Sequence, residues 1–176
     1  HFSATDKQTE KDNKKQDTSL CKADELKVVE YSIISNNMGD KNLLSFSQKI
    51  WSTETPIKNK LFLKFIKDRN YYLAEDPRLV EIKENPDMIC LNISGIDADN
   101  ICLWLNARLP KPEECRSILS KARQEEDFKG LFFWCREGKE YFLFNPKTNS
   151  ISKVYPDLQY KKYTFLPVWE KKPDVQ

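Results

Sequence analysis

The residue types that most often carry out catalysis are scarce in this chain of 176 residues. Its single histidine is His1, within a polar stretch at the start of the given sequence. Histidine is the usual base beside a nucleophilic serine or cysteine and the commonest metal ligand, so these arrangements are disfavoured in the folded part. The four glycines are scattered, which disfavours a glycine-rich phosphate-binding loop. The sequence therefore predicts no catalytic residue, no metal ligand and no cofactor.

Carboxylates offer the remaining route to bond-making chemistry, at two places in the chain. Asp97 and Asp99, in the sequence GIDADN, could supply oxygen ligands to calcium. That stretch lacks the glycine and the terminal glutamate of an EF-hand loop, so a solvated polar turn is the favoured interpretation. Asp76, Glu81 and Lys83 resemble fragments of metal-dependent nuclease sites. Their spacing is too tight for such a site, however, and an edge strand of alternating charge is enough to explain them. An enzymatic function is therefore disfavoured.

Five cysteines raise the question of thiol or disulfide chemistry. Their number is odd, and neither a CxxC pair nor a zinc-like spacing occurs among them. All but Cys21 lie in apolar patterns, namely Cys90, Cys102, Cys115 and Cys135. Two interpretations stay open at even weight. These four are either small core side chains with a raised thiol pKa, or a pool that supplies one or two disulfides in an oxidising compartment.

The charge balance bears on the kind of partner. Lysine and arginine total 29 against 27 aspartates and glutamates, so the net charge is only +2. That is too small to favour nucleic acid or an anionic membrane surface. Tyrosine and tryptophan contribute strongly to protein interfaces, and the chain has several at positions compatible with strand edges or loops. The predicted partner-binding candidates are Trp51, Tyr71, Tyr72, Tyr160, Tyr163 and Trp169.

The sequence divides into a polar leader at 1–24, one β-rich globular domain at 25–170 and a frayed tail at 171–176. The leader has almost no apolar side chain to bury, so we expect it to be flexible. No apolar run approaches the ~20 residues that span a bilayer. A leader of this kind is common between an export signal or lipid anchor and a folded domain. We therefore expect a secreted or periplasmic location, with a cytoplasmic one as the alternative.

The domain centres on the segment 130–156, GLFFWCREGKEYFLFNPKTNSISKVYP. Three short aromatic and β-branched runs, at 131–136, 140–144 and 151–155, are separated by turn sequences. This pattern predicts an antiparallel meander. Both faces of the first run are apolar, so we expect a central strand that is covered on both sides.

The remaining segments predict further strands and one helix. Alternating or mixed apolar patterns favour strands at 27–34, 42–52, 59–67, 71–74, 78–83, 88–94, 101–109 and 160–169. In the 101–109 run, Leu103 belongs to the face that is expected to point into the core. Cys115, Ile118, Leu119 and Ala122 form an apolar stripe with helical spacing, which predicts one amphipathic helix at about 112–126. The fold class is thus α+β, mainly antiparallel β, as a meander or barrel-like sheet of roughly eight to ten short strands.

By elimination, the sequence favours a non-catalytic protein-interaction module that binds another protein. One concrete form is an exported inhibitor or immunity-type protein that blocks its partner. The alternative is a small-molecule carrier in which a closed antiparallel barrel surrounds an apolar ligand.

Overall fold

The computed structural model describes residues 26–36, 45–71, 77–121, 128 and 130–174. The described residues form four helices and seven strands, and the strands belong to two separate open sheets. The chain is therefore an α+β protein. The predicted barrel is wrong, because neither sheet closes on itself, and so is the prediction of a single helix. The predicted leader at 1–24 and Tyr72 lie outside the described residues.

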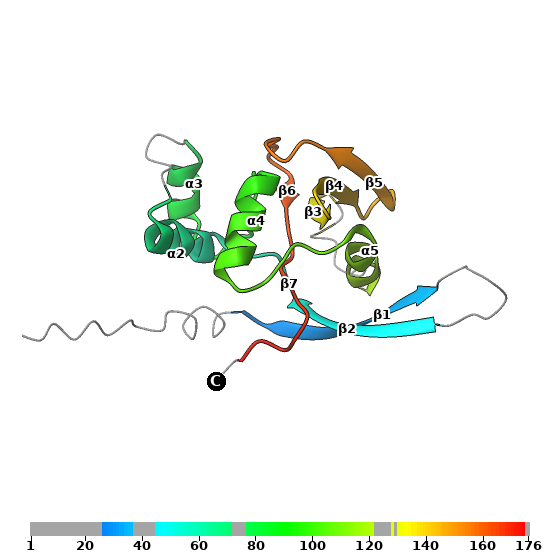
Figure 1. The fold of residues 1–176 in the computed structure, drawn as a ribbon. Helices are drawn as coiled ribbons and strands as arrows, with labels where there is room; N and C mark the ends of the chain where they lie inside the picture. The colour runs from blue at the N-terminus through cyan, green and yellow to red at the C-terminus, as the bar shows by residue number, and fades with distance from the viewer. Residues whose placement is uncertain (1–25, 37–44, 72–76, 122–127, 129, 175–176) are drawn as a thin grey trace, which may run out of the picture.

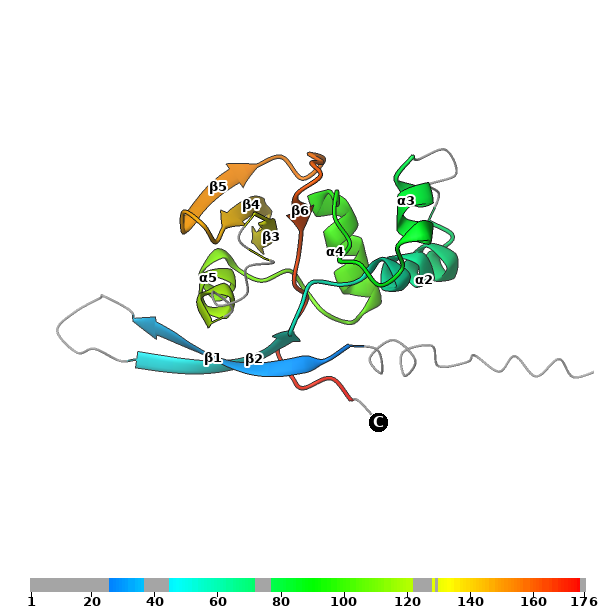
Figure 2. The same ribbon diagram turned by 180° about the vertical axis from the view of Figure 1, so that it is seen from behind.

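The first sheet has the strand order β1-β2-β7 and is built on a long hairpin. β1 spans Val28–Asn36 and β2 spans Ser45–Thr53, and they pair antiparallel with Tyr31 opposite Ile50. Tyr31, Ile33 and Ile50 are buried on the face toward the body of the molecule. The hairpin lies along one side of the molecule, with the helices and the second sheet on its other side (Figures 1 and 2). The predicted strand at 27–34 is thus confirmed, and so is the predicted strand at 42–52 from residue 45 onward, since 42–44 lie outside the described residues.

The second sheet contains the predicted meander. β3 (Phe132–Glu137), β4 (Glu140–Asn145) and β5 (Ser150–Val154) pair antiparallel in sequence order. The first turn uses Gly138 with φ +58°, a left-handed conformation that glycine adopts without a steric penalty. Trp134 packs in one apolar cluster while Phe133 and Cys135 pack in the other. β3 is therefore a central strand covered on both faces, as the alternation predicts.

The predicted strands at 59–67 and 78–83 are helices, and the predicted strand at 101–109 begins within a third helix; only Tyr71 of the predicted strand at 71–74 is described. α2 spans Asn59–Arg69, α3 spans Arg78–Glu84 and α4 spans Gly95–Trp104. α2 buries Leu61, Phe62 and Phe65, and Asn70 ends it in a left-handed conformation with φ 48°. The alternating pattern here is compatible with either structure, and tertiary packing on α4 decides for the helix. The predicted strand at 88–94 contributes only a single bridge, between Lys58 and Ile89.

The predicted amphipathic helix is present as α5, Pro112–Lys121, and the rest of the predicted range, 122–126, lies outside the described residues. Its stripe of Cys115, Ile118 and Leu119 is fully buried, and it packs against β3 and β4. Figure 1 shows α4 between the α2–α3 pair on one side and the second sheet on the other. Among the described helices, none has both the length and the apolar character needed to cross a membrane.

The C-terminal segment joins the two sheets. β6 (Tyr163–Thr164) runs parallel to β3, and β7 (Val168–Trp169) pairs antiparallel with β2 only a few residues later. Side chains and backbone hold the segment from both sides, since Ser52 Oγ donates to Pro167 O at 2.9 Å and Thr164 Oγ1 donates to Cys90 O at 2.9 Å. The predicted strand at 160–169 is therefore two short strands in different sheets.

Candidate functional site

Helix α4 carries the two carboxylates that the sequence analysis considered for calcium. The sequence GIDADN is not a solvated turn, because it forms the first turns of α4. Ser94 is the N-cap residue, and its Oγ accepts a hydrogen bond from the backbone N–H of Asp97 at 3.1 Å. Asp97 and Asp99 are two residues apart, so the ~100° turn per residue directs them to different sides of the helix. One faces the α2–α3 side and the other faces the second sheet.

Asp97 lies in a buried polar cluster with Tyr71 and Arg78. The Tyr71 hydroxyl donates to Oδ1 of Asp97, and Arg78 Nη1 lies 3.6 Å from Oδ2. Oδ2 accepts no hydrogen bond from the described residues, so the guanidinium is the group that compensates its charge. Arg78 Nη1 also donates to the backbone oxygen of Asn92. The side chains of Asp97 and Arg78 are only 7% and 10% exposed, which makes this a buried ion pair.

Asp99 lies in a second cluster of the same composition on the other side of α4. Arg136 Nη1 donates to its Oδ2 at 2.6 Å, and the Tyr141 hydroxyl donates to the same oxygen. The Arg136 guanidinium also lies over the Tyr141 ring, 5.1 Å from the ring centroid. This cluster is more open to solvent, since Asp99 is 15% and Arg136 is 40% exposed.

These contacts define what the two carboxylates can do. Burial and, next, the hydrogen bond to a carboxylate together raise the pKa of Tyr71 and of Tyr141 to about 12. Both phenols are therefore protonated near neutral pH and serve as donors that dock neighbouring elements onto α4. Within the described part of the chain, no group of three or more histidine, cysteine, aspartate or glutamate side chains is placed to hold a metal ion.

The solvent-facing side of α4 is unusually apolar at both ends. Ile96 is 44% exposed and Leu103, seven residues later, is 69% exposed. The segment after β5 continues this surface, because the backbone N–H of Ile96 donates to Pro156 O at 3.0 Å. Three further large side chains of that segment are exposed, namely Tyr155 at 79%, Leu158 at 44% and Tyr160 at 45%. We call Ile96, Leu103, Tyr155, Leu158 and Tyr160 the α4 surface.

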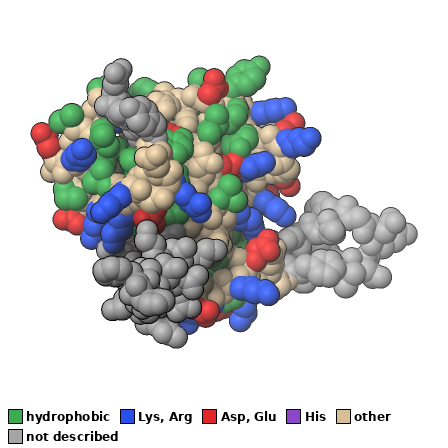
Figure 3. Space-filling model, turned by 60° about the vertical axis from the view of Figure 1, so that its left-hand side comes forward, with side chains coloured by type: hydrophobic (Ala, Val, Ile, Leu, Met, Phe, Trp, Pro, Cys, Tyr) green, Lys and Arg blue, Asp and Glu red, His purple; other side chains and the backbone are tan. Residues whose placement is uncertain are grey.

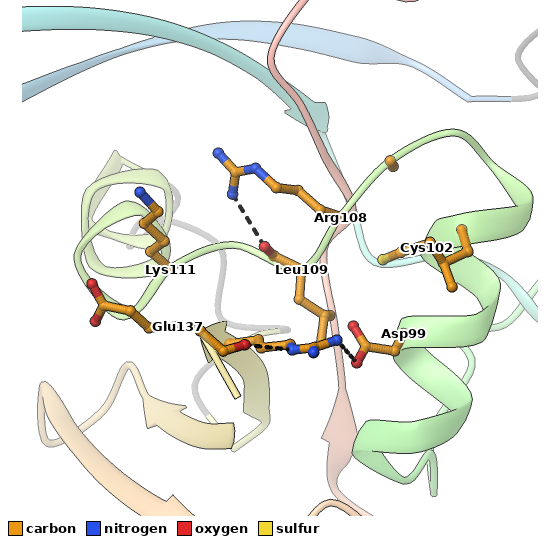
Figure 4. A pocket seen from close by; sticks show the side chains of 10 residues that line it. Asp99, Cys102, Arg108, Leu109, Lys111 and Glu137 are labelled. Carbon is orange, nitrogen blue, oxygen red and sulfur yellow. Dashed lines mark hydrogen bonds and ion pairs between the residues drawn. The ribbon is translucent and has the colours of Figure 1, made fainter. Parts of the chain in front are cut away.

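Two hollows flank Leu103. The first, of about 260 Å³, has Cys102, Ala107 and Leu109 among its apolar lining, with Lys111 and Arg136 among its charged lining, and we call it the Lys111 hollow (Figure 4). The second, of about 410 Å³, lies between α2 and α4 and is lined by Phe65, Arg69, Tyr71, Asn100, Leu103 and Trp104. Leu103 lines both hollows, so it is a projecting apolar side chain with a depression on either side.

The wall of the Lys111 hollow is fixed by a second arginine. Arg108 makes a two-pronged contact with Glu114, with Nη1 2.7 Å from Oε1 and Nη2 2.9 Å from Oε2. Burial alone would raise the pKa of Glu114, but hydrogen bonds from Arg108 and from the backbone N–H of Lys111 lower it below its usual value. Arg108 also donates from Nη1 to Leu109 O, as Figure 4 shows. The hollow therefore has a wall that is held in place by paired groups.

Basic side chains surround the α4 surface. Arg69, Lys111, Lys161 and Lys162 are exposed, and none of them forms an ion pair with a described residue. The neighbouring acids without an ion pair among the described residues are Glu137 and Asp157. Figure 3 shows the face turned toward the α2–α3 side, where blue basic, red acidic and green apolar groups are interspersed. The surroundings of the α4 surface are thus moderately basic.

The partner-binding candidates from the sequence analysis lie in different environments. Tyr160 is part of the α4 surface, and Tyr71 is half-buried and lines one hollow. Tyr163 is half-buried, with its ring 5.6 Å from that of Trp134 in an edge-to-face contact. Trp169 is buried and donates from Nε1 to Leu105 O at 3.1 Å, opposite the half-buried Trp51 in the first sheet. The predicted inward direction of Leu103 is wrong, because that prediction assumed a strand.

The cysteines considered for disulfides are buried as free thiols. Cys90, Cys102, Cys115 and Cys135 are each 0–1% exposed, and no two of them are bonded. Burial raises the pKa of Cys90, Cys102 and Cys115, and a hydrogen bond with Cys135 raises that of Cys115 further. Of the two interpretations left open by the sequence, disulfides are not formed among these four residues, and the four are buried core side chains.

Neither the comparison with protein-family models nor the search of curated proteins finds a match for this chain.

Proposed function

We propose that this protein is a non-catalytic interaction module that binds another protein through the α4 surface. The observation that carries the proposal is the concentration of exposed apolar side chains there. Large apolar side chains are exposed at eight described positions, and five of the eight belong to this one surface. Contiguous exposed apolar groups on a folded protein favour an interaction site over chance exposure.

The shape of the surface supports a protein partner. Leu103 projects between two hollows, so a partner side chain can enter each hollow while Leu103 inserts between them. Tyrosine and large apolar residues in such central positions contribute most of the binding energy in protein interfaces. Tyr155 and Tyr160 add aromatic area that loses little rotamer entropy on binding.

The charge around the surface favours a partner that is apolar at the centre and acidic at the rim. Lys111, Lys161 and Lys162 are available to pair with carboxylates of the partner. Such rim pairs increase the association rate more than the final affinity, and salt screens them. We therefore expect binding that slows as ionic strength rises.

The two aspartate clusters supply the rigidity that a recognition surface needs. They attach α4 to α2–α3 on one side and to the second sheet on the other, so the spacing of Ile96 and Leu103 is fixed before binding. Pre-organisation of this kind lowers the entropic cost of association. An exported inhibitor or immunity-type protein that blocks its partner is one form of this function. A count of thiols that react before and after denaturation of the unreduced protein tests the proposed location, because four or five free thiols would argue against an oxidising compartment.

The experiment compares affinity capture by three immobilised full-length proteins: the wild type, Leu103→Glu and Val80→Glu. Val80 is 61% exposed on α3, away from the α4 surface, so it provides the matched control. We expect a partner that is retained by the wild type and by Val80→Glu and is lost with Leu103→Glu. With the purified partner, Leu103→Glu should weaken binding about 30-fold or more, the range of an interface hot spot.

Equal retention of every captured protein by Leu103→Glu and by the wild type would refute the proposal for this surface. A double variant, Tyr155→Ala with Leu158→Ala, repeats the test on the other half of the surface. Both residues are exposed, so their removal leaves the core intact.

A further inference from the structure

The outer edge of β1 is the feature on which a second inference rests, independently of the α4 surface. In the described part of the chain β1 pairs with β2 alone, so its other edge has no strand beside it. The strand has nine residues, which is long for an edge strand, and it contains no proline, lysine or arginine. Natural edge strands usually carry such residues as protection against pairing with another chain. β1 carries a single charge, at Glu30.

The sequence of β1 is symmetric in residue class about Tyr31. It reads Val-Val-Glu-Tyr-Ser-Ile-Ile from residue 28 to residue 34. Two β-branched apolar residues, one polar residue, a tyrosine, one polar residue and two β-branched apolar residues follow one another. An antiparallel pair of identical strands matches residues in reverse order, so this pattern is self-complementary.

We propose that two copies of this chain pair through their β1 edges, antiparallel and with Tyr31 opposite Tyr31 at a twofold axis. The axis is perpendicular to the sheet, so the buried face of each copy stays on the same side. The two three-stranded sheets then form one continuous sheet. Val28 lies opposite Ile34, Val29 opposite Ile33, and Glu30 opposite Ser32.

Other registers fit less well. Odd-numbered residues of β1 lie on the buried face and even-numbered residues on the outer face. Residues that lie opposite each other must be on the same face, so an allowed register pairs odd with odd and even with even. The neighbouring register centred on Glu30 places the two Glu30 carboxylates opposite each other, which is destabilising. The register centred on Ser32 places Glu30 opposite Ile34. Only the Tyr31 register matches apolar with apolar and polar with polar throughout 28–34.

The exposure of β1 agrees with this register. Ile34 is 67% exposed on the outer face, although it belongs to a regular strand. In the Tyr31 register, Val28 of the second copy lies beside it and covers part of that apolar area. The hairpin lies at one side of the molecule in both views, so its edge is not enclosed between the helices and the second sheet (Figures 1 and 2).

Sedimentation equilibrium of the full chain over a range of concentrations tests the pairing. We expect the average mass to rise from the 20.8-kDa monomer toward twice that value. The twofold axis creates two equivalent contacts between residue 32 of one copy and Glu30 of the other. Ser32→Glu places a carboxylate at both contacts, and Ser32→Lys places an ammonium group at both. We expect Ser32→Glu to weaken the dimer about fivefold and Ser32→Lys to strengthen it by a similar factor.

The effects of the two substitutions on the stability of the monomer can be separated from their effects on the dimer. Ser32 is exposed and lies opposite Lys49 on β2, so a glutamate there is favourable to the folded monomer and a lysine is not. Their effects on the monomer therefore have the opposite sign to their effects on the dimer. A wild type that stays monomeric up to its solubility limit, or two variants that change the mass in the same direction, would overturn the proposal.

The register is tested by oxidising a mixture of two single variants, Glu30→Cys and Ser32→Cys, in a Cys21→Ser background. The four other thiols are buried in the folded chain and do not compete. We expect the covalent dimer to form fastest in the mixture, because residues 30 and 32 lie opposite each other. Faster cross-linking of Glu30→Cys alone or of Ser32→Cys alone would reject the Tyr31 register.

Discussion

The two aspartate clusters on α4 have the same three residue types but different environments. Asp97 binds Tyr71 and Arg78 in the interior, where the two charged side chains are 7% and 10% exposed. Asp99 binds Tyr141 and Arg136 near the surface, where the side chain of Asp99 is 15% exposed and that of Arg136 is 40% exposed. The same chemistry is thus present at two depths, separated by one residue of the same helix.

We expect burial, rather than the length of the ion pair, to decide how much each cluster contributes to stability. The more exposed pair has the shorter ion-pair distance, 2.6 Å against 3.6 Å. Nevertheless, water can replace a lost partner of Arg136, whereas it cannot easily reach Arg78. Loss of one member of a buried pair leaves an uncompensated charge, which is the costly outcome.

The largest predicted difference comes from neutralising each carboxylate. Asp97→Asn removes the buried charge that faces the Arg78 guanidinium, and we expect the free energy of unfolding to fall by about 3 kcal/mol or more. Asp99→Asn should cost only about 1 kcal/mol, because Arg136 is partly solvated. Urea denaturation of both variants measures the difference.

Asp157→Asn is the control for this pair, since Asp157 is exposed and has no ion pair among the described residues. We expect it to change stability by less than about 0.5 kcal/mol. Equal costs for Asp97→Asn and Asp99→Asn would contradict the importance of burial.

A second substitution perturbs only the Asp99 side and adds no charge. A Cβ at Gly95 would lie 3.0 Å from Trp134 Cε3 and 3.0 Å from Tyr141 Cδ1, closer than ordinary contact. Gly95→Ala should therefore displace the Tyr141 ring and cost about 1–2 kcal/mol after the gain in helix propensity. Because Tyr141 would then bind Asp99 less well, Asp99→Asn should cost less in the Gly95→Ala background than in the wild type. Asp97→Asn should lower the free energy of unfolding by the same amount in the Gly95→Ala background and in the wild type. A double-mutant cycle for each aspartate with Gly95 checks both expectations.

The tyrosines make the clusters sensitive to alkaline pH. Each has a folded pKa of about 12 against the ordinary value of 10.0, so the folded state holds its phenolic protons more tightly than the unfolded state. The stabilisation is fully present below pH 10 and is lost as the pH rises from about 10 toward 12. Tyr71→Phe and Tyr141→Phe should each flatten this loss, which urea midpoints at pH 9 and pH 11 detect. An unchanged pH dependence in both variants would show that other groups are responsible.

Salt should produce the smallest difference. An exposed ion pair is screened by added salt, and a buried pair is screened much less. The Asp99–Arg136 coupling energy, measured with Asn and Met substitutions, should fall by a few tenths of a kcal/mol between about 0.1 M and 1 M NaCl. The Asp97–Arg78 coupling should stay nearly constant. The opposite order would show that solvent reaches the inner cluster more easily than the outer one.

The sequence predicts the strands well where alternation and turn residues agree. The meander at 130–156 and the hairpin at 27–52 have both signals, and both are present. The amphipathic stripe of α5 is equally clear. In these segments the local pattern and the tertiary environment favour the same structure.

The helices α2 and α4 were missed for different physical reasons. α2 has lysines at both ends and consecutive apolar residues, a pattern that suits a strand or a helix. α4 lies between two layers, so Ala98, Ile101, Cys102 and Trp104 are all buried and its apolar residues surround much of the helix. Without a single apolar stripe there is no helical period to detect, and only the Ser94 cap marks its start.

The candidate site was predicted only in part, for a related reason. Tyr160 was selected because of its residue type, and it belongs to the α4 surface. Leu103 and Ile96 are exposed because of where α4 packs, which depends on contacts between segments far apart in the sequence. Likewise, no local pattern indicates that Asp97 meets Tyr71 or that Asp99 meets Arg136.

The segment Tyr163–Trp169 supplies a strand to each sheet, and this has a consequence for synthesis in the cell. Neither sheet has all of its strands until these residues have left the ribosome. A chain that is stalled or cleaved before Tyr163 exposes the strand edges that β6 and β7 would otherwise occupy. Such unpaired edges are prone to aggregation, so nascent chains of this protein should depend on chaperones until the segment through Trp169 has emerged from the ribosome.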